Sequence, residues 1–425
     1  MSEERKVKVA LVGNGNRGRG LLGMLLRMED IEMVAVCDRR DDKLEDAKQI
    51  IERKTKELGR DFSSIILTKD YKEVLANPEI EAIFNTTSWA SHINVAVDAM
   101  EAGKDVSIEV GGTNSIEDIW RLVRTQEKTG KQCMMLENCC YGRIELAVLN
   151  MVRQGVFGDV VHCTGGYGHD LRWLFYDMAL TGRERVIDYL HRNCDTYPTH
   201  ALGPIAKILD INRGNRMVSL TSTASCAKGM EEYVNSKEDE THPLYGKRYT
   251  QGDIVTTTIK CAHGETIVLT LDTTLPRPYS RFFTVRGTKG MYSEDGRYVY
   301  TQAQHEHRDG DGFKTTDVYR NIDKYLEEYD HDIWKENLGK VDEKTAKQVE
   351  GGHASIDKLV LRAFVESVKY GTPVPIDVYD CAAWMCITAL SEASIAQGGA
   401  PVSIPDFTNG KWMTTKFEQH SKWSI

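Results

Sequence analysis

At 425 residues, the chain exceeds the ~250 to 300 residues at which a single hydrophobic core usually stops growing, so it predicts two domains. The formal net charge of -9 argues against nucleic-acid binding, which normally uses a basic face. Apolar stretches fall short of the ~20 residues that span a bilayer, and the charged opening has no signal-peptide pattern. We therefore expect a cytoplasmic protein that binds neither nucleic acid nor membrane. The 10 cysteines indicate reduced core or site residues.

The first third of the chain alternates short apolar runs with helical patterns. The runs cover residues 6–13, 32–38, 64–70, 81–87, 105–110 and 132–138. Nearly continuous apolar runs separated by helices are typical of a parallel sheet that is covered on both faces. We therefore predict an α/β domain over residues 1–140, built on a doubly wound parallel sheet.

After this domain the pattern changes to β-rich runs. A helix is predicted over residues 143–153, and the runs follow at 159–168, 253–261, 266–274 and 281–287. These runs predict a second, α+β domain over residues 141–425, with a large, open and mostly antiparallel sheet. Late helices, within about 356–397, are expected to pack partly on the first domain.

The clearest chemical motif is VALVGNGNRGRG, in which Gly13, Gly15 and Gly18 have the spacing G-x-G-x-x-G. The first glycine permits a tight turn, the second lets a pyrophosphate approach the backbone, and the third lets the helix pack on the strand. The motif follows a strand, opens a helix and is followed by Asp38, twenty residues after Gly18. This context predicts a Rossmann domain that binds NAD.

Asp38 would accept hydrogen bonds from the adenosine ribose and would repel the 2′-phosphate of NADP. Arg39 and Arg40 leave NADP open, because an arginine nearby can accommodate that phosphate. Asn16 and Arg17, inside the glycine motif, complete the predicted dinucleotide loop. A glycine turn that binds no ligand is the less favoured alternative.

Three further strands end on polar or small residues, in the segments NTTSWASH (85–92), EVGG (109–112) and ENCCYGR (137–143). Ligands of open parallel sheets bind beyond the carboxyl ends of the strands, so these segments should converge on one crevice. Packing is as good an interpretation of Trp89 as cofactor contact. We assign to cofactor binding Trp89, His92, Glu109, Val110 and Asn138.

These features together resemble the glucose–fructose oxidoreductase and inositol dehydrogenase superfamily. Longer segments are similar to glycoside hydrolase family 109, the NAD-dependent α-N-acetylgalactosaminidases: ENCCYGR, GGYGHDLR, HRNCDTYPTHALGPIAKILDINRGNRM, TTLPRPYS and DVYDCAAWMCITALSEAS. The resemblance covers nearly the whole chain. It implies a glycosidase with tightly bound NAD that acts on α-N-acetylgalactosaminides, or on other α- or β-glycosides. It also implies a dimer or larger homo-oligomer.

Two departures distinguish the chain from ordinary dehydrogenases of the superfamily. Those enzymes usually have Glu-Lys-Pro after the fifth strand, where this chain reads Glu109-Val110-Gly111. They also usually have an Asp four residues before the catalytic His. That position is Thr196 here, and Asp195 lies one residue away. If this chain were an ordinary dehydrogenase of the superfamily, it would lack two of the usual acid–base partners. Their absence favours the glycosidase.

The chemistry implied by the resemblance differs from ordinary glycoside hydrolysis, which uses two carboxylates. NAD accepts a hydride from C3 of the sugar, and the resulting ketone acidifies the proton on C2. Removal of that proton expels the aglycone from C1, water adds, and the hydride returns to C3. The cycle produces no net oxidation.

The resemblance also assigns residues to these steps. His200 would be the base at O3, and Tyr167 the base at C2, with His169 two residues along the same strand face. Glu137 is the candidate that assists the leaving group and the incoming water. The positions that match sugar-binding residues of the family are Arg185, Tyr197 and Tyr279.

Alternatives to this interpretation remain. A histidine at a helix start is more often a cap or core residue, so the assignment of His200 depends on the surrounding motif. A plain NAD(P)-dependent sugar or polyol dehydrogenase is the alternative function. A non-catalytic dinucleotide-binding regulator is disfavoured by the clustering of His, Tyr and Glu residues at the predicted crevice.

Two local patterns complete the sequence analysis. Leu202, Ile205, Ile208 and Leu209 predict a helix with a buried stripe, and Pro204 is expected in the first turn of that helix, where a missing N–H costs little. The HEH segment at residues 305–307 lies in an acidic, glycine-rich stretch that is typical of a solvated loop, so we assign no metal.

Overall fold

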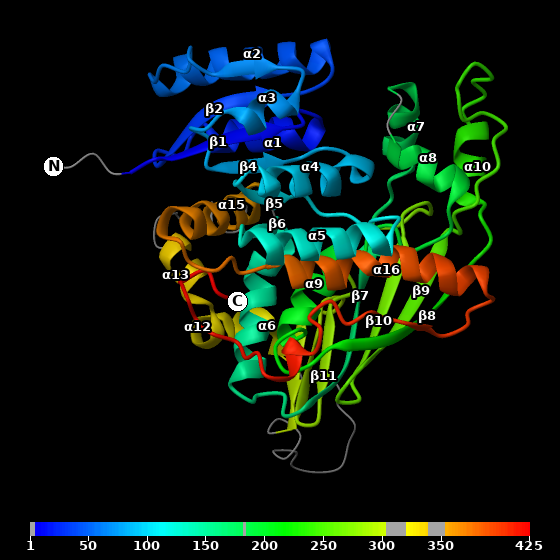
Figure 1. Cartoon of the computed structure of the whole chain (residues 1–425). Coiled ribbons are helices and arrows are strands. Elements are labelled where there is room, and N and C mark those ends of the chain that lie inside the picture. The colour runs from blue at the N-terminus through cyan, green and yellow to red at the C-terminus, as the bar shows by residue number, and fades with distance from the viewer. Residues whose placement is uncertain (1–4, 182–183, 303–319, 339–352) are drawn as a thin grey trace, which may run out of the picture. The chain divides into compact units, whose positions relative to one another are not determined.

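The computed structural model describes residues 5–181, 184–302, 320–338 and 353–425 (Figure 1). The chain divides into two compact units, which are described separately. The first comprises Met1–Tyr141, Val341–Ala382 and Glu418–Ile425, and the second comprises Gly142–Lys340 and Ala383–Phe417. The HEH segment, for which we assigned no metal, lies outside the described residues. No described helix is both long and apolar enough to cross a membrane.

The first unit is built on a parallel sheet whose strand order, within the described residues, is β3-β2-β1-β4-β5-β6. Its strands are β1 (Val7–Val12), β2 (Ile31–Cys37), β3 (Ile66–Thr68), β4 (Ala82–Asn85), β5 (Asp105–Ile108) and β6 (Cys133–Met135). All of these pairings are parallel, which confirms the predicted doubly wound sheet. The strand order reverses between β1 and β4, and ligands of such sheets bind at this switch point.

The helices of this unit alternate with its strands. They are α1 (Asn16–Leu25), α2 (Asp41–Leu58), α3 (Tyr71–Ala76), α4 (Trp89–Glu101), α5 (Ile116–Thr129), the short 3-10 helix η1 (Asn138–Tyr141) and α15 (His353–Tyr370). Helix α1 contacts α2, and α4 contacts α5 (Figure 1). Helix α15 comes from the late part of the chain, and its Phe364 packs edge-on against Phe84 of β4, with 5.3 Å between ring centroids.

The second unit contains the open sheet that the β-rich runs predicted. Its strands, in the described residues, have the order β14-β13-β12-β11-β7-β10-β9-β8-β15. All neighbours pair antiparallel except β7 and β10, which are parallel. The strands are β7 (Val160–Gly168), β8 (Met217–Ala224), β9 (Ile254–Cys261), β10 (Thr266–Asp272), β11 (Thr284–Gly287), β12 (Gly290–Ser293), β13 (Tyr298–Thr301), β14 (Arg320–Asn321) and β15 (Val402–Ser403).

Helices of the second unit cover part of this sheet and form a small separate core. They are α6 (Arg143–Arg153), α7 (Arg172–Leu180), α8 (Glu184–His191), α9 (Thr199–Ile208), α10 (Gly229–Asn235), α12 (Leu326–Tyr329) and α13 (Asp332–Leu338), with the 3-10 helices η3 (Ile322–Lys324) and η4 (Lys411–Met413). Helix α16 (Val378–Ala396) begins in the first unit and continues in the second. Buried residues of α7, α8 and α10 pack together, among them Phe175, Tyr189 and Met230.

Helix α9 packs closely on β7, because glycine stands at the point of contact. A Cβ atom at Gly165 would lie 2.7 Å from Cβ of Ala201 and 2.9 Å from Cδ1 of Ile205. Every residue of α9 is buried. This contact fixes the helix that begins with Thr199 and His200 against the strand that ends with Tyr167 and Gly168.

The prediction for Pro204 is wrong. The proline is the sixth residue of α9, which begins at Thr199, so it lies in the second helical turn. Proline has no N–H to donate to the carbonyl of His200, four residues earlier, and this loss normally destabilises a helix by ~3 kcal/mol. Complete burial of Leu202 and Ile205 offsets this cost. Tertiary packing therefore lets the helix begin at Thr199, earlier than the proline by itself would favour.

Candidate functional site

The glycine motif forms a tight, open-sided turn between β1 and α1. Gly13 has a φ of 97°, and its N–H donates to the carbonyl of Cys37 (2.8 Å). A Cβ at Gly18 would overlap the carbonyl oxygen of Gly13, whereas a Cβ at Gly15 would meet nothing within 4 Å. The first and third glycines therefore serve packing, and the second leaves the backbone open to a ligand. A pyrophosphate fits this arrangement at the N-terminus of α1.

Asp38, at the end of β2, faces the glycine turn. Its carboxylate accepts hydrogen bonds from the backbone N–H of Asn14 (2.7 Å) and of Arg40 (3.0 Å). The guanidinium of Arg40 donates to both carboxylate oxygens of Asp42 (2.8 and 2.9 Å). The acidic group therefore lies where the ribose of a dinucleotide is bound in this fold, and the Arg40 side chain is already engaged by Asp42.

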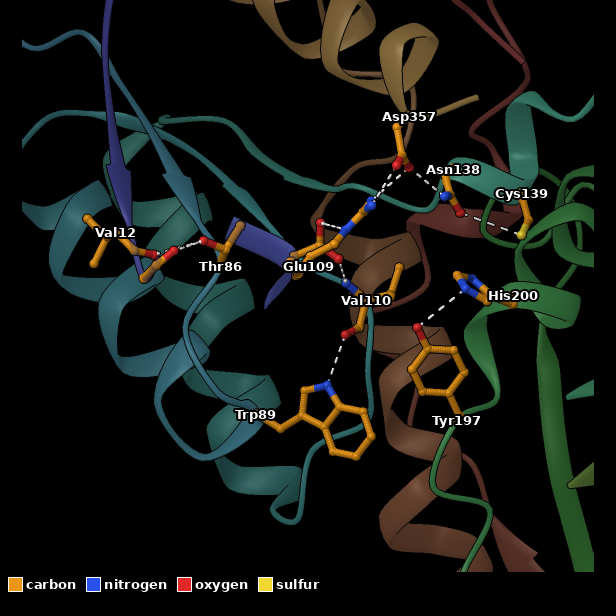
Figure 2. A network of polar contacts seen from close by, with 12 residues as sticks. Val12, Thr86, Trp89, Glu109, Val110, Asn138, Cys139, Tyr197, His200 and Asp357 are labelled. Carbon is orange, nitrogen blue, oxygen red and sulfur yellow. Dashed lines mark hydrogen bonds and ion pairs between the residues drawn. The ribbon is translucent and has the colours of Figure 1, made fainter. Parts of the chain in front are cut away.

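Trp89, the first residue of α4, contacts the segment that follows β5. Its indole Nε1 donates to the carbonyl of Val110 (3.0 Å), as Figure 2 shows. Nearby, the side chain of Asn85 donates to the carbonyl of His92 (2.7 Å) and accepts from the hydroxyl of Thr87 (2.7 Å). These bonds fix the turn between β4 and α4 and support the packing interpretation of Trp89.

His92 is completely buried, and neither ring nitrogen has a hydrogen-bond partner in the described part of the chain. Burial lowers its pKa to about 4, so the ring is neutral at physiological pH. The ring therefore supplies no positive charge that could hold a phosphate.

A partly buried ionic network joins the glycine motif to three other segments. Arg17 donates through Nε to Glu109 (2.8 Å) and through Nη1 and Nη2 to Asp357 of α15 (2.6 and 2.8 Å). Asp357 also accepts from Nδ2 of Asn138 (2.6 Å; Figure 2). Burial opposes the charge of Arg17, but Glu109 and Asp357 together raise its pKa. Burial raises the pKa of Glu109, and Arg17 opposes this shift.

The remaining assigned residues of the first unit lie close to this network in the sequence. Asn16 is the first residue of α1. Glu137, which follows β6, is buried and accepts a hydrogen bond from the backbone N–H of Cys139 (3.1 Å). All the assigned cofactor residues thus lie on segments that follow the carboxyl ends of β1, β2, β4, β5 and β6, or on the helices that these segments open.

In the second unit, an aromatic cluster surrounds Tyr167. The ring centroids of Tyr197 and His200 lie 4.5 and 5.8 Å from that of Tyr167. Those of His169 and Tyr279 lie 5.7 and 6.3 Å from it. The structure therefore brings together residues that are 112 positions apart, from Tyr167 to Tyr279.

Two phenol–imidazole pairs occur inside this cluster. The hydroxyl of Tyr167 lies 3.2 Å from Nδ1 of His169, and that of Tyr197 lies 3.3 Å from Nε2 of His200 (Figure 2). Arg185 of α8 places its guanidinium carbon 4.8 Å from the centre of the Tyr197 ring. Imidazole and phenol groups in hydrogen-bond contact are suited to proton transfer, and the arginine adds a donor with fixed charge.

Asp195 is a residue of this region whose environment the sequence did not predict. Its backbone carbonyl accepts from the hydroxyl of Thr388 (2.8 Å), and its backbone N–H donates to the hydroxyl of Ser391 (2.9 Å). Its carboxyl accepts from the N–H of Tyr197 (3.3 Å), and burial raises its pKa to about 7. Asp195 therefore anchors the loop before α9 on α16.

The fold and these two groups of residues define a class of protein: an enzyme with an NAD-binding Rossmann domain and a second domain built on an open sheet. Family models agree with both parts. Residues 7–137 match the oxidoreductase family with an NAD-binding Rossmann fold, and residues 141–414 match the C-terminal domain of glycosyl hydrolase 109. The chain therefore belongs to glycosyl hydrolase family 109 and is an NAD-dependent glycoside hydrolase.

Relatives extend over almost the whole chain. A glycosyl hydrolase family 109 protein of Stenotrophomonas maltophilia is 38% identical over 97% of this chain and 91% of its own length. An α-N-acetylgalactosaminidase of Tannerella forsythia is 35% identical, over 96% of this chain and 87% of its own length.

Solved structures with a similar fold include oxidoreductases. An NAD-binding oxidoreductase from Klebsiella pneumoniae has a TM-score of 0.68 at 14% identity and covers 94% of this chain and 99% of its own. A levoglucosan dehydrogenase in complex with NADH has a TM-score of 0.66 at 15% identity and covers 95% and 100%. At this identity, the likeness shows the fold alone.

Proposed function

We propose that this enzyme hydrolyses α-N-acetylgalactosaminides by oxidation at C3, elimination, addition of water and reduction. The observation that carries the proposal is the pair of phenol–imidazole contacts, Tyr167 with His169 and Tyr197 with His200. Displacement at C1 normally uses two carboxylates, whereas imidazoles and phenols are suited to removing protons from O3 and C2. The relative from Tannerella forsythia, named an α-N-acetylgalactosaminidase, supports the choice of sugar.

The residues of the first unit fit NAD. The open side at Gly15 accommodates a pyrophosphate, and Asp38 supplies a carboxylate for the ribose hydroxyls. When bound, NAD supplies the acceptor for the C3 hydride and later returns that hydride, which is why the reaction is neutral in oxidation state.

His200 is proposed to take the proton from the C3 hydroxyl. As the second residue of α9 it lies at the positive end of the helix dipole, which disfavours the imidazolium form and preserves a neutral base. The hydroxyl of Tyr197, 3.3 Å from Nε2, orients the ring. Proline at position 204 supplies no N–H to the carbonyl of His200, so the first turn depends on packing for its geometry.

Tyr167 is proposed to take the C2 proton. Its hydroxyl can pass its own proton to Nδ1 of His169, 3.2 Å away, and the ring of Tyr279 lies 5.1 Å from the His169 ring. Arg185 and Tyr197 would hold the sugar through hydrogen bonds and ring contact. Glu137 is proposed to assist the departure of the aglycone and the addition of water.

A plain NAD-linked sugar dehydrogenase is the second candidate, favoured by the match of residues 7–137 to an oxidoreductase family. The two candidates differ in the fate of the cofactor. An aryl α-N-acetylgalactosaminide should release its aryl group while NADH does not accumulate. Accumulation of NADH in proportion to substrate consumed, with no aryl release, would establish the dehydrogenase and refute the proposal.

A second measurement tests the elimination step. In heavy water, the released sugar should carry deuterium at C2, because the C2 proton is removed and replaced from solvent. Ordinary displacement leaves the C2 hydrogen in place, so a product without deuterium contradicts the mechanism. The variant His200→Asn should lose aryl release while retaining NAD. His162→Asn is the matched control. His162 lies near the start of β7, whereas Tyr167 lies near its end, and Nδ1 of His162 contacts the hydroxyl of Thr266 (2.7 Å).

The homo-oligomeric state that the resemblance implies remains a prediction. Light scattering after size-exclusion chromatography measures it directly.

A further inference from the structure

Arg17 lies between the second and third glycines of the dinucleotide motif, yet its guanidinium bonds to carboxylates of the protein. Three of its N–H groups point to Glu109 and Asp357, at distances of 2.6 to 2.8 Å. Both carboxylates are buried, with side-chain exposures of 9% for Glu109 and 3% for Asp357. The pairing with Asp357 is bidentate, the geometry that best fixes an arginine.

Charge balance argues against a direct role for Arg17 in holding phosphate. One guanidinium between two carboxylates leaves the group with a formal charge of one negative unit when all three are ionised. Such a group has no net positive charge with which to attract a pyrophosphate. The arginine is therefore better suited to fixing the shape of the loop than to binding the cofactor itself.

Asp357 is the point at which the network converges. It accepts hydrogen bonds from Arg17 of the glycine motif and from Asn138 of η1, and Figure 2 shows the contact with Asn138. Through Arg17 it is linked to Glu109, which follows β5. These segments follow the carboxyl ends of β1, β6 and β5, where ligands of this fold bind. Asp357 comes from α15, 340 residues after Arg17, so a late helix holds the first turn of the domain.

We propose that Asp357 is a positioning residue for the cofactor: together with Glu109 it holds Arg17, and thereby fixes the dinucleotide loop in the shape that accepts NAD. The proposal rests on the NAD-binding domain and does not depend on which sugar is cleaved. Its failure is therefore distinguishable from failure of the proposed glycosidase reaction.

A double-mutant cycle on the full chain tests this proposal. Asp357→Asn, Arg17→Met and the double variant are each titrated with NAD by calorimetry after removal of bound cofactor. Each single variant should bind NAD at least about tenfold more weakly. The double variant should bind no more weakly than Arg17→Met, because residues in one network have non-additive effects.

The direct-contact alternative makes the opposite prediction. If Arg17 binds phosphate itself, Asp357→Asn releases the arginine and leaves NAD affinity unchanged or raises it, which would overturn the proposal. Arg17→Lys gives a second test. Lysine keeps the charge but lacks the bidentate fork, so affinity should fall if positioning matters and persist if only charge at the phosphate matters.

The same helix provides a matched control. Arg362 of α15 pairs with Asp30, which precedes β2 at the amino end of the strand, away from the ligand edge. Asp30→Asn should lower the melting temperature about as much as Asp357→Asn but leave the NAD dissociation constant unchanged. Equal loss of NAD affinity in both variants would attribute the effect to general destabilisation and refute a specific positioning role.

Discussion

The replacement Asp195→Asn should change how the stability of the protein depends on pH. Asp195 is 2% exposed, and burial raises the pKa of its carboxyl from 3.8 to about 7, although the N–H of Tyr197 partly opposes the shift. Each pKa unit is worth about 1.4 kcal/mol, so keeping this group ionised in the folded state costs roughly 4 kcal/mol at high pH.

The sign follows from proton binding. Between pH 4 and 7 the unfolded chain has released the Asp195 proton while the folded chain retains it, so stability falls as pH rises and levels off above the folded pKa. Asparagine has no such proton, and its side-chain oxygen can still accept from the N–H of Tyr197. Relative to the parent, the variant should therefore gain roughly 2 to 3 kcal/mol between pH 5 and pH 8.

Urea unfolding of both proteins at pH 5, 6, 7 and 8 measures this difference. Asp41→Asn removes the same charge from a side chain that is 86% exposed, and it controls for net charge. A constant difference between Asp195→Asn and the parent across this range would refute the argument, because it would mean that Asp195 titrates alike in the folded and unfolded chains.

Four further substitutions have definite expected outcomes. His92→Leu should reduce the fall in melting temperature between pH 6.5 and pH 4.5. The buried ring has a pKa of about 4, so in this range the unfolded chain binds a proton that the folded chain does not, and folding becomes less favourable. An equal fall in melting temperature in the variant and the parent would contradict this. Gly15→Ala should keep the parent melting temperature but lose NAD affinity, whereas Gly18→Ala should lose both, since only its Cβ overlaps backbone; calorimetry and thermal unfolding separate the two cases. Tyr197→Phe should lower kcat about tenfold with NAD affinity intact, because His200 loses the hydroxyl at Nε2; steady-state kinetics with an unaltered kcat would exclude the orienting role.

Local patterns in the sequence predicted much of the fold. The apolar runs of the first third correspond to the strands of the parallel sheet, and the spacing of Gly13, Gly15 and Gly18 corresponds to the observed turn. These features can be predicted from the sequence because buried strands are short, nearly continuous apolar runs, and because a tight turn requires glycine at defined positions. The alternating positions Tyr167 and His169 also predict side chains on one strand face, which the structure pairs.

The partners of Arg17 and the position of Pro204 required the tertiary structure. No local pattern indicates that Asp357 binds an arginine 340 residues earlier, because that contact depends on where α15 packs. In the same way, complete burial of α9 against Gly165 decides that the helix continues through Pro204. The sequence by itself determined the periodic elements, the cofactor turn and the family. Packing between distant segments decided which charges meet, because burial and pairing energies depend on neighbours that only the folded chain supplies.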